Sequence, residues 1–132
     1  MKYLLDTDIC VYVINERPRR ALERFVKQEV GEIGVSSVTA AELAYGVAKS
    51  GSLRNRKALE AFLLPLKIAD FDLAAAFSYG EVRRFLEGKG QVIGPLDMLI
   101  AAHAKSLRAT LVTNNLREFK RVPGLAVENW AT

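Results

Sequence analysis

The chain has 132 residues, of which 50% are hydrophobic and 26% charged, and its net charge is +4. This composition excludes disordered, collagen-like and low-complexity chains and predicts a single domain over residues 1–132. The lone cysteine, Cys10, excludes an intrachain disulfide and a Cys-rich zinc site. No apolar run approaches the roughly 18 residues that span a bilayer, and Asp6 interrupts the place where a signal peptide needs apolar residues. We therefore expect a cytoplasmic protein.

Short apolar segments alternate with amphipathic ones, a pattern typical of strands alternating with helices. We expect strands at residues 2–5, 32–36, 67–71, 109–113 and, more weakly, 125–128. We expect helices at residues 9–14, 18–27, 37–49, 53–64, 73–87 and 95–106. Because no hairpin signal joins the strands, the pattern predicts an α/β fold with a central parallel β-sheet flanked by α-helices.

Ligands of such sheets bind beyond the carboxyl ends of the strands, where this chain places Asp6, Ser36 and Thr113. Four acids fall near that edge in the predicted fold: Asp6, Glu42, Asp97 and Glu118.

Each of these acids also has a purely structural interpretation. Asp6, or Asp8 after it, is a good helix N-cap, and Thr39-x-x-Glu42 has the spacing of a capping box. Ser36 or Ser37 is an equally good cap, which would leave Glu42 inside the helix. Asp97 lies where it would compensate a helix dipole, and Glu118 could be a solvated loop acid paired with Lys120 or Arg121.

Together, however, several acids at one end of a sheet would repel one another unless a cation neutralised them. Hard divalent cations prefer oxygen ligands, and Mg²⁺ takes one or two carboxylates with several waters. Basic residues are clustered along the rest of the chain, as in Arg17–Lys27, Arg54–Lys57 and Arg117–Arg121. Acids of this kind in basic surroundings indicate metal-assisted phosphodiester hydrolysis on a nucleic acid.

Other catalytic arrangements find little support in the sequence. His103 is the only histidine and stands among alanines, which favours a packing or surface role over catalysis. Without a second candidate base, Ser-His-Asp and Cys-His chemistry is not supported, and no Gly-rich phosphate loop is present.

Four segments in order resemble a known family: Leu4-Leu5-Asp6-Thr7-Asp8-Ile9, Ser36-Ser37-Val38-Thr39-Ala40-Ala41-Glu42-Leu43-Ala44-Tyr45-Gly46, Ile93-Gly94-Pro95-Leu96-Asp97-Met98-Leu99-Ile100-Ala101-Ala102-His103-Ala104 and Leu111-Val112-Thr113-Asn114-Asn115-Leu116-Arg117-Glu118-Phe119. They are similar to the PIN-domain ribonucleases and, more closely, to the VapC toxins of type II toxin–antitoxin modules. The resemblance covers nearly the whole chain.

The resemblance implies a Rossmann-like PIN fold and an endoribonuclease that depends on Mg²⁺ or Mn²⁺. It also implies a homodimer inhibited by a cognate VapB antitoxin, and an RNA substrate such as tRNA, with the anticodon loop of initiator tRNA as one possibility. Asp6 and Asp97 match the family's principal metal ligands, and Glu42 matches its third acid. Thr7 and Thr113 match the hydroxyl residues that help to position the site.

Two positions depart from the family pattern. Asp8 stands where Asn is frequent, which adds a charge near the metal. Asn115 stands where a fourth acid is frequent, and Glu118 is the acid available instead. The resemblance therefore leaves open which of these two residues fills the fourth position.

Two other classes share an acidic pair after the first strand. A haloacid-dehalogenase-like phosphatase would use Asp6 as nucleophile and Asp8 as acid, and a receiver-type signalling domain would also begin with such a pair. The phosphatase needs a further acidic pair after a later strand, where Thr113-Asn114-Asn115 supplies none. The receiver domain needs an acceptor Asp after a middle strand, where this chain has Ser36-Ser37.

Overall fold

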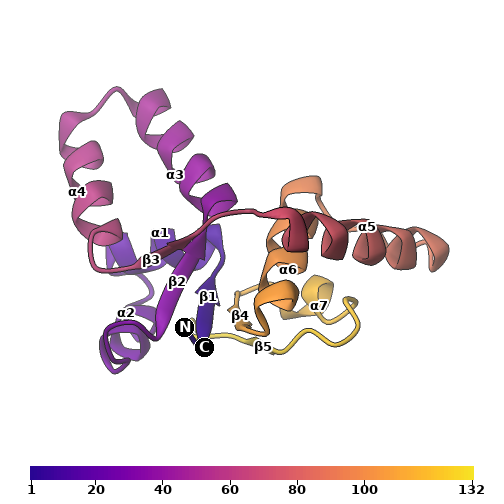
Figure 1. The fold of residues 1–132 in the computed structure, drawn as a ribbon. Helices are drawn as coiled ribbons and strands as arrows, with labels where there is room; N and C mark the ends of the chain where they lie inside the picture. The colour runs from indigo at the N-terminus through magenta and orange to yellow at the C-terminus, as the bar shows by residue number, and fades with distance from the viewer.

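The computed structural model describes residues 1–132 and confirms the predicted α/β fold (Figure 1). Five parallel strands form one sheet in the order β3-β2-β1-β4-β5. The strands are β1 (Tyr3–Leu5), β2 (Ile33–Ser36), β3 (Lys67–Ala69), β4 (Thr110–Val112) and β5 (Val127–Glu128). The first strand is therefore central, and the chain crosses over before each neighbouring strand, as parallel pairing requires.

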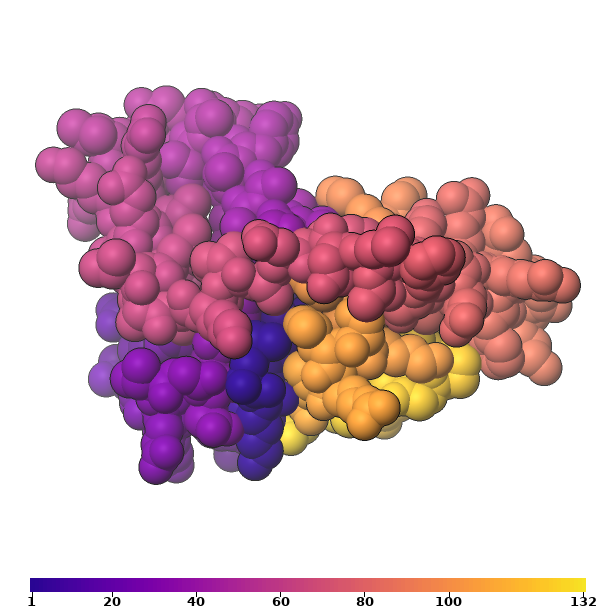
Figure 2. Space-filling model, in the orientation of Figure 1, coloured from indigo at the N-terminus to yellow at the C-terminus, as the bar shows by residue number.

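Seven helices connect and flank the strands: α1 (Thr7–Asn15), α2 (Arg19–Val26), α3 (Ser37–Ser50), α4 (Leu53–Leu63), α5 (Leu73–Gly88), α6 (Pro95–Leu107) and α7 (Leu116–Phe119). The α3–α4 hairpin and the far end of α5 extend from the body as two arms (Figures 1 and 2). No helix is long and apolar enough to cross a membrane.

The central strand buries side chains on both of its faces. Leu4 packs in a cluster with residues of α5, α6 and α7, including Val82, Ile100 and Phe119. Tyr3 and Leu5 point to the opposite face and pack in a second cluster with residues of α1, α2 and the C-terminal Trp130. This burial on both faces explains why the segment is continuously apolar and not alternating.

Side-chain caps decide where several helices begin. Asp6, Ser36, Ser52 and Asp72 each accept a hydrogen bond from a backbone N–H in the first turn of the following helix. The capping-box interpretation of Thr39 and Glu42 is wrong, because Ser36 caps α3 and leaves Glu42 well inside the helix. Asp8 is likewise not a cap, because Asp6 occupies that position for α1.

The expected loop after β4 contains a short helix. Asn115 is its N-cap, and Glu118 lies in its only turn. The sequence stretch is too short to show helical periodicity, but Phe119 is buried in the core and fixes the turn against the sheet. Glu118 is therefore held by a helix and not by an irregular loop.

Candidate active site

The carboxyl ends of three neighbouring strands meet at one edge of the sheet. Asp6 follows β1, Ser36 ends β2 and Thr113 follows β4. All three side chains are buried, with Asp6 only 5% exposed. The structure thus confirms the predicted polar edge of the sheet, and it buries one of the acids there, Asp6.

Asp6 sits where its negative charge is costly. Its Oδ1 accepts a hydrogen bond of 2.9 Å from the backbone N–H of Ile9, and the Thr113 side chain donates a second hydrogen bond to it. Burial nevertheless raises the pKa of Asp6 to about 7, and the charges of Asp8 and Asp97 contribute in the same direction. The cap interpretation is correct for Asp6, but a cap alone does not require a carboxylate with this pKa.

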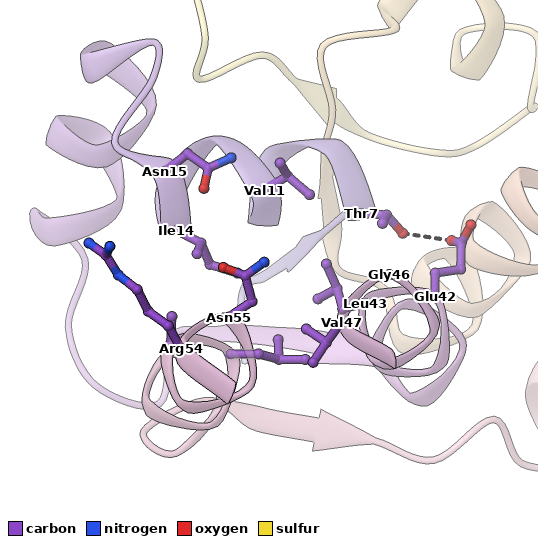
Figure 3. Close-up of a pocket in the computed structure, with 12 residues that line it drawn as sticks. Thr7, Val11, Ile14, Asn15, Glu42, Leu43, Gly46, Val47, Arg54 and Asn55 are labelled. Atoms are coloured by element: carbon purple, nitrogen blue, oxygen red, sulfur yellow. Dashed lines mark hydrogen bonds between the residues drawn. The ribbon is translucent and has the colours of Figure 1, made fainter. Parts of the chain in front are cut away.

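Glu42 is held at the same edge by a residue from another helix. The hydroxyl of Thr7, the first residue of α1, donates a hydrogen bond of 2.6 Å to Glu42 Oε1 (Figure 3). Thr7 thus joins α1 to α3, as Thr113 joins β4 to Asp6. Both hydroxyl residues expected to position the site contact a carboxylate.

Asp97 lies in the first turn of α6, after Pro95 opens the helix. Burial raises the pKa of Asp97, and the negative charges of Glu42, Glu118 and Asp8 raise it further. None of these effects comes from a Lys or Arg, and none of the protein's ion pairs includes these carboxylates. Acids from four separate segments therefore share one electrostatic environment without a basic partner.

Glu118 and Asn115 have different surroundings. Asn115 Oδ1 faces the backbone N–H of Glu118 at 3.5 Å, where it caps α7. Glu118 is partly buried, acts on Asp97, and forms no ion pair with Lys120 or Arg121. The structure thus brings Glu118 to the acidic edge and engages the Asn115 oxygen in helix capping.

The donor set is compatible with a hard divalent cation. No three acidic, His or Cys side chains converge closely enough here to bind one ion together. Mg²⁺ needs only one or two carboxylates and completes its coordination with waters. Asp6 and Asp97 supply that number, and a cation between them would stabilise the charged forms that burial and mutual repulsion disfavour.

A cleft that the sequence did not reveal begins at this edge. Its volume is about 540 Å³, and it lies between α1, α3 and α4. Figure 3 shows Thr7 and Glu42 at one end, Arg54 and Asn55 toward the other, and apolar side chains between them. Its apolar residues include Val11, Ile14, Leu43 and Val47. Helical periodicity assigns such residues to a core face, so only the placement of α4 shows that they line a cleft.

His103 is fully buried, so the packing interpretation holds and the surface one does not, and it lies within hydrogen-bonding distance of Ser36. The sequence gives no sign of that contact, because the two residues are 67 positions apart.

Comparisons with known proteins agree with this geometry. Residues 3–125 match the PIN domain family. The chain is 50% identical to Ribonuclease VapC2 of Rickettsia felis and 41% identical to the tRNA(fMet)-specific endonuclease VapC of Salmonella typhimurium, with 98% of each chain covered in both cases. Its fold superposes with a TM-score of 0.88 on a crystal structure of Rickettsia felis VapBC2 bound to a promoter DNA fragment, at 49% identity, covering 98% of this chain and 99% of that chain. These similarities do not support the phosphatase or the receiver-domain alternative.

Proposed function

Because this chain belongs to the VapC ribonucleases of the PIN-domain family, we propose that it is a single-domain, Mg²⁺-dependent endoribonuclease with its active centre at the acidic edge of the sheet. The observation that carries the proposal is the acidic edge itself. The charges of Asp8 and Asp97 raise the pKa of Asp6, those of Glu42, Glu118 and Asp8 raise the pKa of Asp97, and no ion pair includes any of these acids. A bound cation supplies the missing positive charge.

Within this proposal Asp6 and Asp97 bind Mg²⁺, or Mn²⁺ in its place. The cation would activate water and stabilise the leaving oxygen of a phosphodiester. Thr113 orients the Asp6 carboxylate, and Thr7 occupies one oxygen of Glu42 and leaves Oε2 free to accept a proton from water. Catalytic roles thus fall to Asp6, Glu42, Asp97 and Glu118.

The supporting residues have separate tasks. Thr7 and Thr113 fix two of the carboxylates, and Asn115 caps the helix that carries Glu118. Asp8 is exposed and adds negative charge beside Asp6, which favours binding of a cation over the empty site.

The proposed substrate is tRNA, in particular the anticodon loop of initiator tRNA. A relative that is 41% identical over 98% of this chain is named a tRNA(fMet)-specific endonuclease. Helix α7 and the two residues after it also place basic side chains next to Glu118 in the chain, with Arg117 and Lys120 exposed and Arg121 partly exposed. These cations can contact phosphates of a strand whose scissile bond lies at the acidic edge.

The test is to incubate the purified protein with total cellular RNA in Mg²⁺ or in EDTA and to map every new RNA end. We expect one dominant Mg²⁺-dependent cut in the anticodon loop of initiator tRNA, with elongator methionine tRNA as the matched control. The Asp97→Asn variant, purified in parallel, reports any contaminating nuclease. A dominant cut in another RNA would contradict the proposed substrate, and undiminished cleavage in EDTA would contradict the metal.

We further propose that a VapB antitoxin inhibits this chain by occupying the cleft between α1, α3 and α4. Solved structures similar to this chain are VapBC complexes. The apolar middle of the cleft suits an apolar segment, and its Glu42 end suits an Arg or Lys of the partner as a charge-assisted hydrogen-bond donor.

Growth measurements test the inhibition. Induction of the wild-type chain alone is expected to stop growth, and co-expression of the antitoxin encoded beside it is expected to restore growth. Asp97→Asn serves as the inactive control at matched protein level. Harmless, strong expression of the wild-type chain alone would contradict the proposal.

We also propose a cytoplasmic homodimer. Large apolar side chains on α3 and α5 are exposed in the single chain, among them Tyr45, Leu73 and Phe77. Light scattering is expected to give twice the 14.6 kDa chain mass, whereas a monomeric mass would contradict the dimer. The cytoplasm contains the proposed tRNA substrate, and its reducing conditions suit the unpaired Cys10.

A further inference from the structure

A buried hydrogen bond links the two helices that carry Glu42 and Asp97. His103 Nδ1 in α6 lies 2.8 Å from the hydroxyl oxygen of Ser36, the residue that caps α3. Both side chains have no exposed surface. We propose that this bond sets the separation of the Glu42 and Asp97 carboxylates, which makes His103 a positioning residue for the metal-binding site.

The other contacts of Ser36 are compatible with its hydroxyl donating this bond. Its oxygen already accepts the backbone N–H of Val38 at 3.1 Å, so its own proton is available for His103 Nδ1. Burial lowers the pKa of His103, against opposing contributions from Asp72 and from the backbone and side chain of Asp70, so the neutral ring is favoured. A neutral ring that accepts at Nδ1 carries its proton on Nε2.

The rest of the ring is held by packing. Nε2 has no hydrogen bond of good geometry, although the Asp70 backbone acts on the ring, and the edge-on ring of Phe71 lies 5.3 Å away, centroid to centroid. The bond to Ser36, at 2.8 Å, is the short side-chain hydrogen bond that fixes the ring's rotation. In a buried site a hydrogen bond of this kind selects one arrangement of the helices that it joins.

The position of the bond suits a spacing role. Glu42 lies six residues beyond Ser36, in the helix α3 that Ser36 caps. Asp97 lies six residues before His103, and both are in α6. Six residues of helix correspond to about 9 Å. A shift of α3 against α6 at the bond is therefore carried by rigid helix to both carboxylates.

The inference rests on the proposed metal-dependent function and is tested by Mn²⁺ binding to the metal-free protein, measured by calorimetry. His103→Leu removes the bond, and His103→Asn keeps a hydrogen-bonding atom near the position of Nδ1. Ser78→Ala is the matched control, because Ser78 in α5 donates a hydrogen bond of 2.8 Å to the Ala102 carbonyl of α6 and forms no hydrogen bond with α3. We expect His103→Leu to weaken Mn²⁺ binding about tenfold, as loss of a group that orients metal ligands does. His103→Asn and Ser78→Ala are expected to stay within about twofold of wild type.

Ser36→Ala removes the bond from the other side and serves if His103→Leu fails to fold. Because it also removes a helix cap, its control is Ser52→Ala, which removes the cap of α4 and no contact between α3 and α6. We expect weaker Mn²⁺ binding for Ser36→Ala alone.

The outcomes separate the two proposals. Wild-type Mn²⁺ affinity in folded His103→Leu or Ser36→Ala would overturn the positioning role and leave the metal site intact. An equal loss in the matched controls would also overturn it, because loosening α6 or α4 elsewhere would then weaken Mn²⁺ binding as much as loss of the bond does. Absence of Mn²⁺ binding by the wild-type protein would overturn the metal site, and the positioning role with it.

Discussion

Acidic side chains on the helix surfaces and those at the carboxyl edge of the sheet have opposite surroundings. On the surfaces, Glu23, Glu60 and Glu87 each lie within 4.0 Å of an Arg four residues earlier in the same helix, and all are largely exposed. At the edge, Asp6, Glu42, Asp97 and Glu118 form no ion pair, although the chain has 19 basic residues against 15 acidic ones.

This difference shows what each group of acids contributes. A helical pair at i,i+4 stabilises the fold by about 0.3–0.5 kcal/mol and can be lost at little cost. The edge acids instead destabilise the empty protein, because burial and mutual repulsion raise the pKa values of Asp6 and Asp97. Destabilising clusters of this kind are typical of functional sites, and the proposed function of these acids is to bind a cation that contacts the phosphates of the substrate.

The largest effect is expected when an edge acid is removed, and removal of one surface acid serves as the comparison. We expect Asp97→Asn to lower RNA cleavage by about three orders of magnitude, because several kcal/mol of transition-state stabilisation depend on the metal and each 1.4 kcal/mol is a factor of about ten. Glu60→Gln removes an acid of the other group and breaks only the exposed pair with Arg56. The measurement is the single-turnover cleavage rate of both variants at saturating Mg²⁺.

Glu60→Gln is expected to cleave at the wild-type rate and to unfold within about 0.5 kcal/mol of it. Undiminished cleavage by folded Asp97→Asn would remove the basis for distinguishing the two groups of acids.

A second prediction concerns stability in the absence of metal. The pKa of Asp6 is about 7 in the folded protein and close to its ordinary value of 3.8 when unfolded. Between these values the folded state binds more protons, so the free energy of unfolding falls as pH rises from about 4 to 7. At pH 8 in EDTA, Asp6→Asn is expected to be more stable than wild type by on the order of 4 kcal/mol, because the pKa of Asp6 is raised by about three units and each unit corresponds to about 1.4 kcal/mol.

Urea unfolding at pH 4.5 and pH 8 measures this effect. Asp72→Asn is the matched control, because Asp72 also caps a helix, accepting the Ala75 N–H at 2.9 Å, but is exposed. Mg²⁺ at pH 8 should stabilise wild type and leave Asp6→Asn unchanged. Equal stabilities of wild type and Asp6→Asn at both pH values would show that the Asp6 charge carries no cost.

Most of the fold was predictable because its signals are local. The apolar run before Asp6, the capping residues Ser52 and Asp72, and Pro95 at a helix start each act over a few residues, and the structure confirms the elements they mark. The choice of cap for α3 was not predictable, since Ser36 and Thr39 both satisfy the local rule. Ser36 is the cap because the strand before it ends there and fixes its backbone.

The site was predictable as a set of residues and not as a set of contacts. The predicted parallel sheet places Asp6 and Thr113 at one edge with Glu42, Asp97 and Glu118 near it, and similarity to the family indicates their roles. The bonds from Thr7 to Glu42 and between Ser36 and His103 join residues 35 and 67 positions apart, and no local pattern encodes them. The short α7 also had too few residues for periodicity, so the orientation of Glu118 needed the structure.

The smallest expected effect distinguishes the two candidates for the fourth position at the edge. Glu118 raises the pKa of Asp97 and has no basic partner, whereas the Asn115 oxygen caps α7. We expect Glu118→Gln to lower cleavage about tenfold or more, because a hydrogen bond to a charged group contributes about 1.5–3 kcal/mol. Asn115→Ala removes a cap that contributes about 1 kcal/mol to the helix and should lower cleavage only about threefold. Asn115→Asp preserves the cap and is its control. Cleavage rates at saturating Mg²⁺ decide between them: a neutral Glu118→Gln beside a severely impaired Asn115→Ala would assign the fourth position to Asn115 and place Glu118 with the surface acids.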